Sequence, residues 1–270
     1  MKKILLFGLT KDLKVYLENI RNLDVDVMGV IGRNHEVKQK EYCGLPIFSI
    51  EDIVKTNYEE IHVLPSSFKS IKQELILRGI DTKNIVAPAK SLLHNHLFVD
   101  VKISNFAEQF ISDISARGVL RDINIFVDAG TLLGFARDGK LIKWDNDIDF
   151  SICEKDINVL ISILDELSIN TYRMFYERSE GVISGYVSYN STNIPFDFYV
   201  RRFEGNVVVN LSENFLSTDS IHFLDSDLVQ INQDHKVLFP KHHKKYLESV
   251  YGPSWLVPNL EFSFADYISE

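Results

Sequence analysis

Aspartates inside strand-forming sequence constrain this chain more than any other feature. Asp147 and Asp149 are two residues apart in the segment WDNDIDF, and Asp197 lies later in the segment NIPFDFYV. Residues two apart on a strand point to one face of a sheet. A solvated acidic turn would explain the first pair alone. A carboxylate within an apolar strand, however, is costly to desolvate unless it is paired or metal-bound. The aspartates together therefore predict two strands that bring their carboxylates around a cation.

A strand, a tight turn and a helix are expected just before this acidic segment. Residues 125–128 are typical of a strand that ends in a carboxylate, and Gly130 and Thr131 then open a helical run over Leu132–Arg137. A glycine lets a ligand approach the backbone, and a helix N-terminus offers free N–H groups to an anion. The segment therefore predicts an anion site, to which Arg137 adds a cation.

The order of these segments is that of a nucleotidyltransferase-fold active site. A helix with a glycine at its start is followed by a strand bearing Asp147 and Asp149, then by a strand bearing Asp197, with residues 185–189 as its neighbour. Hard oxygen ligands suit Mg²⁺ or Mn²⁺. Carboxylates that hold two such ions would clamp both ends of an in-line phosphoryl displacement.

The segment FVDAGTLLGFARDGKLIKWDNDIDFSI resembles the LicD family, which includes bacterial phosphocholine transferases and the fukutin-related proteins. The family pattern of an aspartate, GTLLG, an arginine and WD-x-D-I/V-D falls on Asp128, Gly130–Gly134, Arg137 and Trp144–Asp149. A closing segment similar to that of the family contains Phe239, Pro240, Tyr246, Leu247, Tyr251, Gly252 and Trp255. The likeness covers roughly residues 105–260.

This resemblance implies an enzyme, a LicD-type phosphotransferase. Its reaction would move a phospho-group, phosphocholine-like or polyol-phosphate-like, from a CDP-linked donor to a sugar hydroxyl. The acceptor would belong to a surface glycan such as a capsule, a lipopolysaccharide or a teichoic acid. Such transfer depends more on positioning and charge neutralisation than on covalent chemistry.

The resemblance also implies roles for individual residues. Asp147 and Asp149 would bind the metal ions, and Asp197 would share a metal and accept the proton of the acceptor hydroxyl. Phosphate oxygens would be held by Gly130, Thr131 and Arg137. Asp128 and Asp145 would orient the metal-binding and phosphate-binding residues without contacting the substrate themselves.

Departures from the family pattern bear on the substrate. Lys143 stands where proline is common, Asn146 where a third aspartate is common, and Asp138 where histidine is frequent. None removes an expected metal ligand. His243 and Lys244 belong to the densest cationic run, which is either a solvated helix face or a clamp for the phosphates of the donor.

The start of the chain alternates strand and helix patterns. This alternation predicts parallel βαβ units. We expect an α/β domain with a Rossmann-like parallel sheet over residues 1–90 and an α+β nucleotidyltransferase-fold domain over residues 91–270. Strand patterns cover residues 3–8, 25–31, 60–64 and 84–86, and helical spacing covers residues 12–22, 68–78 and 101–117.

The turn after the first strand contains Gly8, where a dinucleotide fingerprint would need three glycines. Gly8 either allows a tight turn only, or forms part of a turn that receives the phosphate of a cofactor. The segments DVMGVIGRN, GLPIFSIEDI and EIHVLPSS resemble the N-terminal domains of bacterial sugar-modifying enzymes, including PglD-type sugar acyltransferases. That resemblance implies a site for a nucleotide or nucleotide-sugar, and not a dehydrogenase.

Charge and composition exclude some partners. The net charge of −9 argues against binding to bulk nucleic acid or to an anionic membrane, which needs a basic face. Two cysteines without a CxxC motif fit a reducing, cytoplasmic setting. No segment approaches the roughly 18 apolar residues of a membrane span. If the acceptor is a membrane lipid, the protein would reach it from the inner face.

The sequence leaves other functions open. The same carboxylates would serve a nucleotidyltransferase that acts on a sugar phosphate or on a protein. A non-catalytic sensor of a nucleotide or nucleotide-sugar is a further alternative, although the presence of all three aspartates weighs against it. The transferred group, the base, the acceptor and the oligomeric state are not determined by the sequence.

Overall fold

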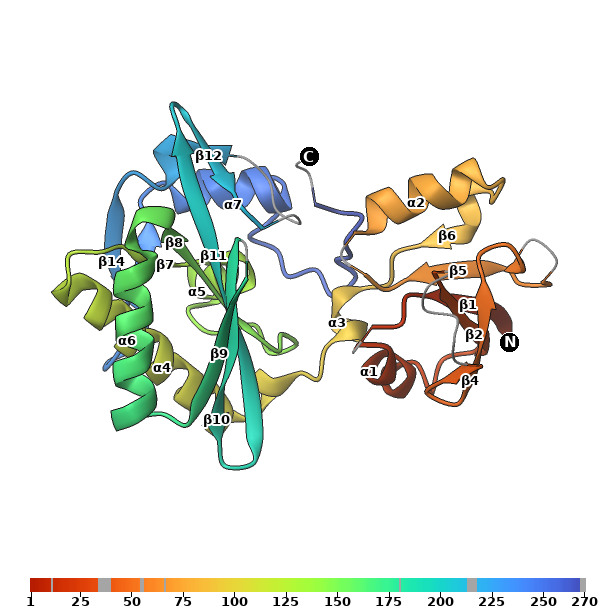
Figure 1. The fold of residues 1–270 in the computed structure, drawn as a ribbon, viewed down its shortest axis with the longest axis horizontal. Coiled ribbons are helices and arrows are strands. Elements are labelled where there is room, and N and C mark those ends of the chain that lie inside the picture. The colour runs from red at the N-terminus through yellow and green to blue at the C-terminus, as the bar shows by residue number, and fades with distance from the viewer. Residues whose placement is uncertain are drawn as a thin grey trace. The chain divides into compact units, whose positions relative to one another are not determined.

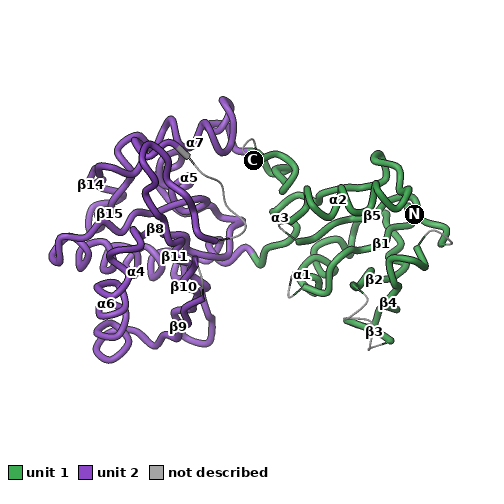
Figure 2. The backbone as a smooth tube through the Cα atoms, turned by 45° about the horizontal axis from the view of Figure 1, so that its top comes forward, with its two compact units in different colours: residues 1–95, 259–267 green, residues 96–258, 268–270 purple. Residues whose placement is uncertain are grey.

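The structure is a computed structural model that divides into two compact units (Figure 2). Unit 1 contains residues 1–95 and 259–267, and unit 2 contains residues 96–258. The structure describes residues 1–10, 12–33, 40–53, 56–65, 67–179, 181–212 and 218–267.

Unit 1 is built on a sheet with the strand order β3-β4-β2-β1-β5-β6 (Figure 1). Its strands are β1 (Lys2–Phe7), β2 (Val25–Gly32), β3 (Glu41–Tyr42), β4 (Leu45–Ser49), β5 (Glu60–Val63) and β6 (Ile85–Val86). All neighbours pair in parallel except β3 and β4. The predicted parallel βαβ arrangement is confirmed.

The sheet of unit 1 has an apolar core on each face. Its helices are α1 (Asp12–Asn19), α2 (Phe68–Leu77) and α3 (Lys90–Leu93). Leu13 and Tyr16 of α1 pack with one set of strand side chains, and Ile71 and Leu75 of α2 pack with the set that points the other way. Burial of alternate strand residues on opposite faces explains the apolar runs over residues 4–7 of β1 and 27–31 of β2.

The C-terminal segment 259–267 belongs to unit 1, whereas the sequence analysis assigned it to the second domain. The backbone N–H of Lys90 donates to the carbonyl of Phe262 at 2.7 Å, and the Ser91 hydroxyl donates to the Leu260 carbonyl at 2.9 Å. Phe264 packs against both apolar cores of unit 1. These long-range contacts have no signal in the local sequence.

Unit 2 contains a larger mixed sheet, in which β13-β12-β11-β8-β7-β15-β14 follow one another and β10 and β9 extend from β11. The central pair, β8 and β11, is parallel. The strands are β7 (Ile125–Val127), β8 (Ile148–Cys153), β9 (Met174–Ser179), β10 (Val182–Tyr189), β11 (Thr192–Glu204), β12 (Val207–Asn210), β13 (Thr218–Asp219), β14 (Ser226–Gln230) and β15 (Lys236–Pro240).

Helices cover both faces of this sheet. They are α4 (Val101–Leu120), α5 (Ala129–Asp138), α6 (Ile157–Asn170) and α7 (His243–Tyr251). Phe110 of α4 packs against Phe150 and Phe196, with ring centroids 6.5 and 5.5 Å away. The opposite face of β8 and β11 carries the predicted aspartates and meets α5 and α7.

Two element boundaries differ from the sequence expectation. Helix α5 begins at Ala129 rather than Leu132, because the Asp128 carboxylate accepts the Ala129 N–H at 2.8 Å and caps the helix. Strand β8 begins at Ile148, so Asp147 lies in the preceding connection and not on the strand. Pairing of β11 with β8 starts immediately after Pro195, which has no N–H to donate.

None of the helices in the described ranges combines the length and apolar character that a membrane crossing requires.

Candidate active site

Asp149 and Asp197 lie directly opposite each other on the parallel strands β8 and β11. Residues paired in this way point to the same face of a sheet. The side chain of Asp149 is buried, and that of Asp197 is partly exposed. The structure therefore brings together these two carboxylates from strands about fifty residues apart in the chain, as the sequence analysis expected.

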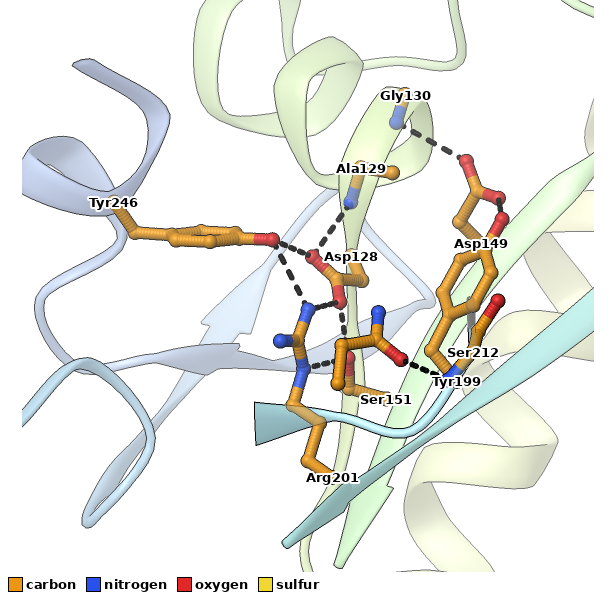
Figure 3. Close-up of polar contacts among 10 residues, drawn as sticks. Asp128, Ala129, Gly130, Asp149, Ser151, Tyr199, Arg201, Ser212 and Tyr246 are labelled. Carbon is orange, nitrogen blue, oxygen red and sulfur yellow. Dashed lines mark hydrogen bonds and ion pairs between the residues drawn. The ribbon is translucent and has the colours of Figure 1, made fainter. Parts of the chain in front are cut away.

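Helix α5 holds Asp149 in place through its first turn (Figure 3). The Gly130 N–H donates to Asp149 Oδ2 at 3.1 Å, and the Asp149 N–H donates to the Thr131 hydroxyl at 2.9 Å. The helix N-terminus also favours a negative charge at this point. The N–H that the sequence analysis assigned to a phosphate is thus engaged by a carboxylate of the protein itself. Phosphate contacts by Gly130 and Thr131 stay predictions.

Tyr199 lies beside the negatively charged aspartates of the site. Its hydroxyl donates to Asp149 Oδ1 at 3.2 Å. Burial raises the pKa of Tyr199 well above its ordinary value, and the charges of Asp149, Asp197, Asp147 and Asp128 raise it further. Asp147 precedes the strand, two residues before Asp149, and its charge also acts on Tyr199. This concentration of negative charge favours a cation.

The donor chemistry at this site fits Mg²⁺ or Mn²⁺, since carboxylate oxygens are the ligands that hard divalent cations prefer. The side chains are not arranged as a complete metal site. Within the described ranges, no group of three or more His, Cys, Asp or Glu side chains could hold a metal ion. Both carboxylate oxygens of Asp149 accept hydrogen bonds, one from the Gly130 N–H and one from the Tyr199 hydroxyl. Binding of a metal would require these side chains to turn.

Gly130 is required by the close approach of two carboxylates. A Cβ atom at this position would lie 2.3 Å from Asp145 Oδ2 and 3.4 Å from Asp149 Oδ2. Asp145 is buried and lies against the start of α5. Its expected role as a supporting residue stays a prediction, but its position beside the site is established.

A buried polar cluster lies behind the site, formed by Asp128, Ser151, Arg201 and Tyr246 and called here the Asp128 cluster (Figure 3). Asp128 forms an ion pair with Arg201 and accepts a hydrogen bond from Ser151, while Tyr246 of α7 donates to Asp128 Oδ1 at 2.8 Å. Arg201 also donates to Ser151 at 2.7 Å and to Tyr246 at 3.1 Å. The cluster therefore joins β7, β8, β11 and α7.

Charge compensation makes this cluster tolerable in the interior. Side-chain exposure is 1% for Asp128 and 4% for Arg201. Burial acts to raise the pKa of Asp128, but Arg201, Ser151 and the Ala129 N–H outweigh it and hold that pKa below its ordinary value. The guanidinium of Arg201 also lies over the ring of Phe223, 4.2 Å from its centroid. These contacts fit the expected role of Asp128 as a positioning residue, which stays a prediction.

Backbone strain occurs at the same junction. Ala129 has a φ of 40°, which is unusual for a residue other than glycine. The contacts of Asp128 and Gly130 on either side of it hold this conformation. Strain that the surroundings enforce is often found at functional sites.

Arg137 is not brought to the start of α5. It lies near the other end of the helix, and its guanidinium donates to both oxygens of Asp138, with distances of 2.7 to 3.1 Å. The departure from the family pattern at Asp138 thus gives Arg137 an internal counter-ion. Lys143 is exposed in the connection before β8. Phosphate binding by either residue stays a prediction.

The remaining candidates lie elsewhere. His243 is partly buried at the start of α7, where its Nδ1 lies 3.1 Å from the Pro240 carbonyl and burial lowers its pKa. Lys244 is exposed. Gly8 lies in unit 1 with a φ of 111°, and a Cβ there would lie 2.8 Å from Pro65. The tight turn alone accounts for this glycine, and a bound phosphate stays a prediction.

Sequence reasoning missed Tyr199, Arg201, Ser151 and Tyr246 as residues of the site. A signal was present, because Tyr199 and Arg201 follow Asp197 at intervals of two on one strand and so share its face. Their buried partners come from distant parts of the chain, and that pairing has no local signature.

The fold of unit 2 and the aspartates on its central strands define a nucleotidyltransferase-type domain. The family comparison is specific: residues 122–251 match the family model for the LicD/FKTN/FKRP nucleotidyltransferase domain. This match places the domain of residues 122–251 in the LicD/FKTN/FKRP family and supports a transferase. Residues 1–86 match a second family model, described as C2185-like, N-terminal.

Solved structures offer only distant likenesses. ANT(2″)-Ia in complex with adenylyl-2″-tobramycin is 15% identical over 57% of this chain and 82% of that chain, with a TM-score of 0.36. A Thermotoga maritima protein described as a nucleotidyltransferase is 17% identical over 51% and 79%, with a TM-score of 0.30. A myo-inositol dehydrogenase from Corynebacterium glutamicum is 13% identical over 98% and 92%, with a TM-score of 0.26. TM-scores of this size assign neither fold nor activity. No match was found among curated proteins.

Proposed function

We propose that this protein transfers a phospho-group from a CDP-linked donor to a sugar hydroxyl in the synthesis of a surface glycan. The group transferred is phosphocholine-like or polyol-phosphate-like. The observation that carries the proposal is the register of Asp149 with Asp197, beside Asp147, within the residues that match the LicD family.

The charges at the site support this chemistry. Phosphoryl transfer requires that negative charge on the donor be neutralised and that the attacking oxygen be positioned. Asp147, Asp149 and Asp197 would hold Mg²⁺ or Mn²⁺, which supplies that neutralisation when bound. Asp197 is the more exposed of the two paired aspartates, so it is the better placed to accept the proton of an incoming hydroxyl.

The residues behind the carboxylates keep them in register. Thr131 holds the backbone of β8, and Gly130 allows Asp145 and Asp149 to approach the start of α5. The Asp128 cluster fixes this helix start to β8, β11 and α7. In this proposal the reaction takes place in the cytoplasm, and at the inner face of the membrane if the acceptor is attached to a lipid.

A screen of donors tests the proposal. CDP-choline, CDP-ribitol, CDP-glycerol and the nucleoside triphosphates would each be incubated with the protein, Mg²⁺ and a mixture of bacterial glycans, and followed by ³¹P NMR. We expect one donor to release CMP only when Mg²⁺ and an acceptor are both present. Consumption of a nucleoside triphosphate with release of pyrophosphate, and of no CDP-linked compound, would instead indicate nucleotidyl transfer and contradict the proposal.

A further inference from the structure

The face of the sheet that bears the aspartates continues past them onto β10 and β9 (Figure 1). One row of paired residues runs from Asp149 through Asp197 and Ser184 to Glu177. Paired residues point to the same face, so all four side chains lie on the face of the candidate active site. The aspartates are therefore one end of a continuous polar row.

The next row on the same face is aromatic. Tyr186 of β10 pairs with Phe175 of β9 on one side and with Pro195 of β11 on the other. The rings of Phe175 and Tyr186 are stacked, with centroids 5.8 Å apart and an interplanar angle of 29°. Their exposures are 52% and 37%. This aromatic pair is a preformed, accessible apolar surface next to a row of polar side chains.

The position of the pair relative to the carboxylates indicates which substrate it meets. Tyr186 is one strand away from Asp197 and two residues along, which places their Cα atoms about 8 Å apart from standard sheet dimensions. Helix α5, whose first turn holds Asp149, lies on the β7 and β8 side of the carboxylates, and the aromatic pair lies on the β9 and β10 side. In an in-line displacement the attacking and leaving groups occupy opposite sides of the phosphorus.

We propose that Phe175 and Tyr186 form the acceptor subsite, where they stack against the apolar face of a pyranose ring. The proposal rests on the proposed function. The electron-rich faces of aromatic rings attract the weakly positive C–H groups on one face of a sugar. Ser184 and Glu177 in the adjacent row provide hydrogen-bonding groups for its hydroxyls. Because β9 is at the edge of the sheet, a saccharide chain can extend past it.

The test measures saccharide binding without turnover. Wild-type protein would be applied to an array of bacterial polysaccharides and oligosaccharides, and the affinity for the best ligand would be measured for each variant. We expect Phe175→Leu/Tyr186→Leu to weaken binding at least about tenfold, which corresponds to about 1.4 kcal/mol. Tyr186→Phe, which keeps the ring, should bind as wild type. Leucine keeps an apolar side chain at these exposed positions, so the fold should be retained.

Matched measurements separate this subsite from the proposed reaction. Asp149→Asn should bind the saccharide as wild type does, and CMP should bind equally to wild type and to the leucine double variant. Loss of CMP binding in that variant would make the pair a base-stacking site and overturn the proposal. Full retention of saccharide binding, or no saccharide bound by wild type at millimolar concentration, would also overturn it. If no CDP-linked donor reacts but the leucine variant still loses saccharide binding, the subsite stands and the proposed donor fails.

Discussion

At the scale of single residues, the aspartates of the site differ in their surroundings. Asp128 is surrounded by donors and by the guanidinium of Arg201. Asp149 and Asp197 are paired across two strands on one face of the sheet, and both charges raise the pKa of Tyr199. We assign a structural role to the enclosed Asp128 and propose a metal at the two aspartates that face each other across β8 and β11.

Replacement of Asp149 with asparagine should abolish most of the transfer and leave the fold intact. The variant keeps an oxygen for Gly130 but loses the charge that a metal requires. Loss of such an electrostatic contact costs about 3–4 kcal/mol, or roughly a hundredfold to a thousandfold in rate. Thermal melting should be unchanged or slightly higher without metal, and Mg²⁺ should no longer stabilise the variant. An apo protein that unfolds, or turnover close to that of wild type, would show that Asp149 does not bind a catalytic metal.

Adjacent arginines on β11 allow a matched test of the Asp128 cluster. Arg201→Met leaves a buried carboxylate without its cation, which typically costs about 3–5 kcal/mol. Arg202→Met breaks an exposed pair with Glu154, which solvent screens, so its loss should change stability little. Urea unfolding measures both changes. Equal effects of the two substitutions would contradict the structural role assigned to the cluster.

At the scale of elements, the first turn of α5 holds Asp149 in place on β8. Gly130→Ala introduces a Cβ into the space occupied by Asp145, whereas Gly134→Ala introduces one against the Lys140 carbonyl, 2.7 Å away and outside the site. Overpacking of this kind costs about 1–3 kcal/mol. We expect both variants to melt earlier, but only Gly130→Ala to lose stabilisation by Mg²⁺ with CMP. Normal stabilisation of Gly130→Ala in a thermal-shift assay would exclude this role.

Local sequence patterns predicted some elements well and others poorly. The parallel strands of unit 1 were predictable, because apolar runs separated by helical spacing leave few other arrangements. The pairing of Asp149 with Asp197 followed from the order of the acidic strands. The start of β8 after Asp147 was not predictable, since it depends on pairing with β11, which begins at Ile148 and Phe196. Tyr246 lies more than a hundred residues from Asp128, and only the folded chain brings them together.

At the scale of the whole molecule, the chain leaves unit 1, forms unit 2 and returns to unit 1. Removal of the residues after Pro258 should therefore weaken unit 1. Loss of the hydrogen bonds that Lys90 and Ser91 make with the C-terminal segment should cost on the order of 2 kcal/mol. Hydrogen exchange should quicken in α2 and around Lys90, and stay unchanged in β8 and β11. Faster exchange confined to unit 2 would contradict this division of the chain.

The proposed function requires that Asp147, Asp149 and Asp197 form a site for a divalent metal. The most direct measurement is anomalous diffraction from crystals of the protein grown with Mn²⁺ and CMP. We expect a manganese peak within roughly 2.0–2.6 Å of oxygens from Asp149 and Asp197, with Asp147 turned towards it and the phosphate of the nucleotide on the same ion. A bound nucleotide with no metal between these carboxylates, or manganese bound only elsewhere, would contradict it.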